Sequence, residues 1–122
     1  MMRTGRSRRH AELMRAANSA GAAATAAHIA LGDGPLDARL CAAIVALTRH
    51  RGPSSSICPS DAARAVGGDN WRELAPHSRA IAFMLARKGQ AEILQRGVVR
   101  DPTREWRGPV RIRARSTSEG KP

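Results

Sequence analysis

Residues 57–115 decide the fold and read ICPSDAARAVGGDNWRELAPHSRAIAFMLARKGQAEILQRGVVRDPTREWRGPVRIRAR. The spacing of their apolar residues changes after Gly89, from the period of about 3.6 typical of a helix to the period of about two typical of a strand. Before that glycine, the pattern predicts a helix beginning near Pro59 and a longer helix that ends at the glycine itself. After it, residues 91–96 and 110–115 alternate as the two strands of a hairpin.

Upstream of this stretch, residues 37–50 show the most regular helical pattern of the chain. Leu40, Ile44 and Leu47 follow one another at helical spacing and predict one buried face. Gly52 is followed by a proline, and this pair predicts the end of the helix. A helix therefore precedes the deciding stretch.

The remaining short elements complete the order. Ile57 is expected to form a strand of a single residue pair, and Cys58 or Ser60 is expected to cap the next helix. Residues 71–74 predict one helical turn, after which Pro76 restarts the long helix. The predicted order is that of a winged helix: helix, short strand, helix, helix, strand, loop and strand. We therefore predict an α+β fold with three helices and a C-terminal β-hairpin wing.

The ends of the chain differ from this domain. Residues 1–35 are rich in Ala and Arg and lack a broad apolar face, so we expect a flexible or partly helical extension. The winged-helix domain spans 36–115, and 116–122 form a disordered tail. An alternative for the N-terminus is an export signal, because twin arginines occur in SRRHAEL, although Glu12 interrupts the apolar run that such a signal needs.

Composition favours an anionic partner. The formal net charge is +11, and all but two of the 21 basic residues are arginine. Such a charge suits nucleic acid, an acidic protein or a membrane surface. A composition rich in Ala and Arg is also what a GC-rich genome encodes, so charge alone does not identify a phosphate ligand. Nothing is apolar and long enough to span a bilayer, and two cysteines in this context fit a reducing cytoplasm.

A set of short motifs carries a family resemblance. They are ICPS at 57–60, Ala63-Arg64, Trp71-Arg72, Leu74, Pro76, Arg79, Gly89, Gln95-Arg96-Gly97, Asp101-Pro102 and Gly108-Pro109-Val110-Arg111. Through them the chain, over residues 37–115, resembles a family of small bacterial proteins of unknown function that is assigned to the winged-helix superfamily. The resemblance implies the fold and no activity.

The long helix supplies the first group of candidate DNA-binding residues. The second helix of a helix-turn-helix enters the major groove of DNA with its N-terminal half and outer face. His77, Arg79 and Arg87 fall on this helix, and Arg72 falls on the helical turn before it. A guanidinium group can bind guanine edges or phosphate oxygens in bidentate fashion. For each residue the alternative is a solvated basic surface.

The wing supplies the second group. Seven arginines and only two carboxylates, Asp101 and Glu105, lie between residues 96 and 115, and Trp106 lies among them. Basic and aromatic side chains together suit a phosphate backbone or an unstacked base. The predicted nucleic-acid-binding residues here are Arg96, Arg100, Arg104, Trp106 and Arg107. Alternatively, the carboxylates pair with neighbouring arginines and Trp106 folds back onto the hairpin.

Signatures of catalysis are missing from the sequence. It contains no Gly-rich phosphate loop, no nucleophile elbow and no metal-ligand spacing of His and Cys. We therefore predict no enzyme activity, no cofactor and no metal. Cys58 precedes a helix N-terminus, where the helix dipole favours a thiolate, so a thiol-based sensor is one hypothesis and a structural cysteine the preferred one.

These observations together predict a small basic binding module in the cytoplasm. The leading function is binding of duplex DNA, with backbone contacts dominating and specificity weak. The alternative is a winged-helix protein-interaction module without nucleic-acid binding, which an acidic protein would suit, because fold alone does not choose between partners. The sequence determines neither the target site nor the oligomeric state.

Overall fold

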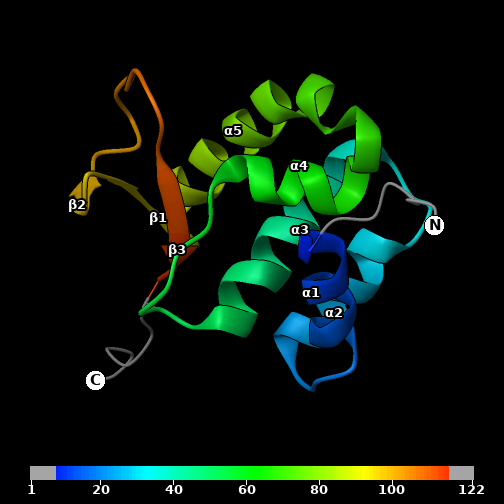
Figure 1. Cartoon of the computed structure of the whole chain (residues 1–122). Coiled ribbons are helices and arrows are strands. Elements are labelled where there is room, and N and C mark those ends of the chain that lie inside the picture. The colour runs from blue at the N-terminus through cyan, green and yellow to red at the C-terminus, as the bar shows by residue number, and fades with distance from the viewer. Residues whose placement is uncertain (1–7, 116–122) are drawn as a thin grey trace.

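The computed structural model of the chain describes residues 8–115 (Figure 1). Five α-helices and a three-stranded antiparallel sheet occupy this range, so the α+β class is confirmed. The helices are α1 (Arg8–Ala17), α2 (Ala22–Leu31), α3 (Leu36–Arg51), α4 (Pro59–Gly67) and α5 (Trp71–Arg87), with a 3-10 turn at Gly68–Asn70 before α5. The strands are β1 (Ala91–Gln95), β2 (Val98–Arg100) and β3 (Arg111–Ala114). Within residues 8–115, no helix is long and apolar enough to cross a bilayer.

A row of three isoleucines joins the sheet to the helices. Ile93 of β1 pairs with Ile112 of β3, and Ile57 pairs with the other side of Ile112. Two backbone hydrogen bonds of 2.8 and 2.7 Å close the latter bridge. All three side chains are fully buried. The predicted single-pair strand at Ile57 and the predicted pairing of β1 with β3 are thus confirmed.

The structure contains a strand that the sequence did not indicate. Residues 97–109 were expected to form one long loop, whereas β2 pairs with β1 in the sheet order β2-β1-β3. The two strands are joined by Arg96 and Gly97, with φ angles of 54° and 79°. Positive φ at both positions is the requirement of a type I′ hairpin turn. An arginine at the first position obscured this turn, because Asn or Gly usually occupies it.

Helix α5 corrects the prediction that Pro76 restarts a helix. It is continuous from Trp71 to Arg87, with Pro76 inside it. Proline lacks the N–H that would bond to the carbonyl of Arg72, so one hydrogen bond is lost near the helix start. Packing on α4 offsets that loss, because the buried Ser78 hydroxyl donates to the carbonyl of Pro59 at 2.6 Å.

Residues 1–35 were predicted to form a flexible or partly helical extension, and the part described from residue 8 onward is helical. Helices α1 and α2 pack on α3 and α4, and Leu13, Ala16, Ala27 and Ala30 are fully buried. The apolar stripe looks thin in the sequence because it consists mostly of alanine. Small side chains let the helix backbones approach closely, and α3 supplies alanines of its own to that contact. The folded unit therefore extends upstream of residue 36. The predicted tail at 116–122 lies outside the described residues.

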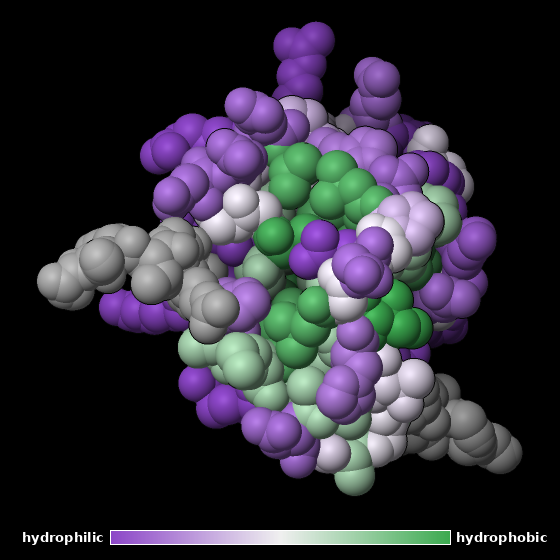
Figure 2. Space-filling model, turned by 90° about the vertical axis from the view of Figure 1, so that its right-hand side faces the viewer, coloured by the Kyte–Doolittle hydropathy of each residue, from purple (hydrophilic) through white to green (hydrophobic). Residues whose placement is uncertain are grey.

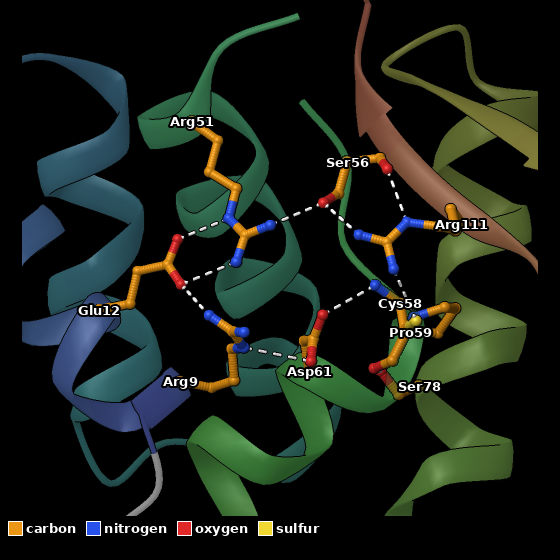
Figure 3. Close-up of polar contacts among 9 residues, drawn as sticks. All are labelled: Arg9, Glu12, Arg51, Ser56, Cys58, Pro59, Asp61, Ser78 and Arg111. Carbon is orange, nitrogen blue, oxygen red and sulfur yellow. Dashed lines mark hydrogen bonds and ion pairs between the residues drawn. The ribbon is translucent and has the colours of Figure 1, made fainter. Parts of the chain in front are cut away.

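A buried carboxylate fixes α1 to the remainder of the fold (Figure 3). Glu12 is 6% exposed, and Arg51 at the end of α3 donates to its two oxygens at 2.7 and 3.1 Å. Arg9 donates to the same carboxylate at 2.5 Å and to Asp61 of α4 at 3.2 Å. The hydrogen bond from Arg51 is the main cause of a lowered pKa of Glu12, and it outweighs the effect of burial, which raises that pKa.

Replacement of Glu12 by Gln should lower the free energy of unfolding by about 3 kcal/mol, the lower end for breaking a buried pair, because both arginines keep some contact with water. The pH dependence should change as well. With a folded pKa below the ordinary value of about 4.3, Glu12 stabilises the fold fully above that pH. This contribution is lost as pH falls through the folded pKa. Urea unfolding between pH 3 and pH 7 (roughly the range in which a carboxyl titrates) measures both effects.

The matched control for this variant is Glu73→Gln on the exposed surface of α5. It should leave stability within about 0.5 kcal/mol of the parent protein. Equal effects of the two substitutions would show that Glu12 does not hold α1 in place.

Candidate nucleic-acid interface

Helices α4 and α5 form a tight helix pair whose ends are locally determined. The backbone N–H of Cys58 donates to the carboxylate of Asp61 at 2.8 Å. This capping-box contact makes Cys58 the N-cap residue of α4. At the other end, Gly68 adopts a φ of 56°, a conformation that favours glycine. The helix pair follows α3 in the chain.

The thiol of Cys58 is engaged by the sheet (Figure 3). Arg111 of β3 donates to its sulfur at 3.2 Å and to the hydroxyl and carbonyl oxygens of Ser56, both at 2.7 Å. These contacts place Cys58 at a junction between α4 and β3. The thiol-sensor hypothesis remains a prediction, and among residues 8–115 no group of three His, Cys, Asp or Glu side chains is arranged to hold a metal ion.

Arg79 binds the wing instead of facing solvent. Its guanidinium donates to the carbonyl of Gly108 at 2.8 Å and to the carbonyl of Trp106. It also lies 5.4 Å from the centre of the Phe83 ring. Both hydrogen-bonding arms are therefore used inside the protein. We assign Arg79 to positioning the wing.

Trp106 folds back onto the hairpin. Its indole N–H donates to the carbonyl of Asp101 at 2.7 Å, and the guanidinium of Arg100 lies 4.9 Å from its ring centre. The ring is half-buried and packs against the core. Arg100 is also half-buried, and its Nε has no hydrogen-bond partner in the described part of the chain. The wing tip is thus a compact loop with an aromatic centre.

The carboxylate of Asp101 shapes this loop. It accepts from the backbone N–H of Thr103 at 2.9 Å and from its hydroxyl at 2.6 Å. These two hydrogen bonds lower the pKa of Asp101, with a smaller contribution from the charge of Arg104. Arg104 itself approaches Asp101 only to 3.9 Å, and its side chain is 76% exposed. Internal pairing therefore leaves this arginine largely available to a partner.

The other predicted residues occupy three places. Arg72 is exposed at the start of α5 and lies 4.7 Å from the ring centre of Trp71. His77 is exposed and pairs with Asp37 of α3. Arg96 is exposed at the turn between β1 and β2. Five predicted residues meet at one cleft of about 430 Å³ between α5 and the wing, and they are Arg79, Arg87, Arg104, Trp106 and Arg107. Arg100 lies outside the lining of this cleft.

Two further residues help to build this interface. Gln95 at the end of β1 donates to the carbonyl of Arg107 at 2.6 Å, and Phe83 of α5 lines the cleft. Sequence reasoning missed Gln95, although a polar side chain at the end of a strand beside a loop is a usable indication. Phe83 is half-buried at this position.

Comparison with known proteins agrees with the family resemblance. The family model described as "Protein of unknown function (DUF3253)" matches residues 37–115, from the first turn of α3 to just beyond β3, and the chain belongs to this family. No curated protein matches the chain. The two N-terminal helices lie outside the matched region.

Arg79→Gln should loosen the wing, because it removes two hydrogen bonds from a charged donor to backbone carbonyls. We expect the free energy of unfolding to fall by about 1.5–3 kcal/mol. Amide exchange over residues 101–109 should accelerate. In a Trp71→Phe background, the emission of Trp106 should shift to the red as its ring meets water.

Arg87→Gln is the control, because Arg87 lies on the same side of α5 and approaches the wing only at 3.4 Å, through the carbonyl of Pro102. It should change wing exchange little. An unchanged Trp106 spectrum in Arg79→Gln would contradict the positioning role.

Proposed function

We propose that this member of the DUF3253 family binds duplex DNA through the face that α5 and the wing form together. One observation carries the proposal: exposed arginines gather on these elements without strong internal partners. They are Arg72, Arg87, Arg96, Arg104 and Arg107. The hydrogen bond of Arg87 to the carbonyl of Pro102 and the ion pair of Arg104 with Asp101 are long, at 3.4 and 3.9 Å. The net charge of +11 supports the same partner.

Contacts to phosphate dominate in this proposal. Each exposed guanidinium that meets a phosphate releases a condensed counterion, which favours binding at low salt. Arg72 is partly ordered beforehand by its contact with Trp71, so less side-chain freedom is lost on binding. Arg79 and His77 are engaged within the protein, which favours contacts to phosphate by other residues over base reading by these two. Sequence specificity is accordingly weak.

The proposal assigns a binding role without catalysis. The order of α3, the Ile57 bridge, α4, α5, β1 and β3 supports a winged-helix arrangement, in which α5 is the recognition helix. A cytoplasmic location fits this role, since DNA is accessible there and the two free cysteines remain reduced.

An apolar surface favours a second candidate, a protein-interaction module. Figure 2 shows apolar side chains gathered in the centre of the face on the right of Figure 1, on the helical side of the molecule, away from the wing. Large apolar side chains exposed in this helical part are Met14, Ile29 and Leu36, at 45%, 52% and 40%. Exposed apolar surface ringed by polar residues is typical of protein contacts.

The double substitution Arg72→Gln and Arg96→Asn tests the DNA-binding face outside the cleft. Asn suits the positive φ at position 96, so the turn is retained. If both arginines contact phosphates, the slope of log K against log salt concentration should become shallower by about 1.8 for a blunt duplex. The loss should be similar for every duplex sequence. Fluorescence anisotropy at several salt concentrations measures it.

A matched control removes the same charge elsewhere. Arg8→Gln with Arg15→Gln changes two exposed arginines of α1, on the opposite side of the molecule from the wing. Its salt slope should equal that of the parent protein. Equal slopes in all three proteins would contradict DNA binding by this face and would favour the protein-interaction module.

A further inference from the structure

The cleft between α5 and the wing has the form of a small-ligand site. One wall is a stripe of α5 with Arg79, Phe83 and Arg87, and the other is the wing loop with Arg104, Trp106 and Arg107. Its volume of about 430 Å³ lies within the usual range of ligand pockets, roughly 300–1,000 Å³. Because Arg79 holds the wing carbonyls in place, the two walls are set before any ligand arrives.

The aromatic part of the cleft is fixed in orientation. The indole N–H of Trp106 is bonded to the carbonyl of Asp101, and Arg100 covers part of its ring. Arg100 does not line the cleft, so a different part of the indole faces it. Phe83 adds a second ring from the opposite wall. A flat apolar group can pack against two rings that are already ordered at little cost in side-chain entropy.

The charged part of the cleft suits an anion. Four arginines line it against a single carboxylate, that of Glu105. Arg79 is committed to the wing, whereas Arg87 makes only a contact of 3.4 Å and Arg104 only one of 3.9 Å. Arg107 is exposed, and its backbone carbonyl, not its guanidinium, accepts from Gln95. Three guanidinium groups thus remain for a phosphate, which they bind in bidentate fashion.

We propose that this cleft binds one nucleotide, with its base against Phe83 and Trp106 and its phosphate on Arg87, Arg104 and Arg107. This inference deepens and rests on the proposed nucleic-acid binding, and it adds that the wing recognises an unpaired nucleotide. Two sources present this chemistry: a free nucleoside monophosphate and an unpaired nucleotide at a strand end. Stacked, paired bases inside a duplex do not offer their faces to such a cleft.

Fluorescence of Trp106 tests the proposal in the full chain carrying Trp71→Phe. Titration with dAMP should quench the emission and give an affinity about tenfold or more above that of deoxyadenosine or inorganic phosphate, because each of these satisfies only one half of the cleft. In a competition arm, a duplex with a short single-stranded overhang should bind about tenfold tighter than the blunt duplex of the same length.

Arg104→Gln with Arg107→Gln should abolish both preferences, and Arg8→Gln with Arg15→Gln should retain them. Tight binding of dAMP alone identifies the free nucleotide as the ligand, and preference for the overhang alone identifies a strand end. Either result supports the cleft. Failure of both, or competition by phosphate as strong as by dAMP, overturns it.

The blunt-duplex arm separates this inference from the proposed function. If the protein binds blunt duplex in a salt-dependent way but responds neither to dAMP nor to the overhang, the proposed nucleotide cleft is contradicted and the proposed duplex interface is supported. If the protein responds to dAMP but does not bind blunt duplex, the nucleotide cleft is supported and the proposed duplex interface is contradicted.

Discussion

Two arginines converge on the carbonyl oxygen of Ser56, and this meeting point joins the helices to the sheet. Arg51 of α3 and Arg111 of β3 each donate to it at 2.7 Å (Figure 3). Two like charges at one acceptor repel each other unless their charge is compensated. Glu12 compensates Arg51, and Arg111 remains exposed to water. The helix that the sequence set apart therefore supplies the charge that this junction requires.

The small core explains why polar contacts matter so much here. More than half of the buried apolar residues are alanines, which remove little apolar area from water per residue. Helices that meet through alanines must pack closely and in one register, and a buried ion pair specifies such a register. The wing likewise contains few large apolar side chains. Trp106 and Phe83 supply the aromatic volume there, and Arg79 fixes the loop that carries Trp106.

Several features set by local sequence were predicted, whereas some set by contacts between distant residues were not. The change of apolar period after Gly89 predicted β1 and β3, and the proline after Cys58 predicted the start of α4. The packing of α1 was not predictable, because it depends on Glu12 meeting Arg51, 39 residues away. Of the predicted site residues, Arg72, Arg87, Arg96, Arg104 and Arg107 are exposed. The engagement of Arg79 was not predictable, because it depends on the folded path of the wing loop.

The wing therefore combines rigidity with charge, and that combination limits how it can recognise a partner. Arg79 holds the loop through its hydrogen bonds to the wing carbonyls, so its guanidinium is engaged within the protein. In the turn between β1 and β2, Arg96 has a φ of 54°. This conformation costs an ordinary residue about 1 kcal/mol, and Asn or Gly would adopt it more easily. The turn does not require an arginine at that position, and the side chain is exposed. In the proposed function, a preformed loop that presents arginines in this way recognises shape and charge before sequence.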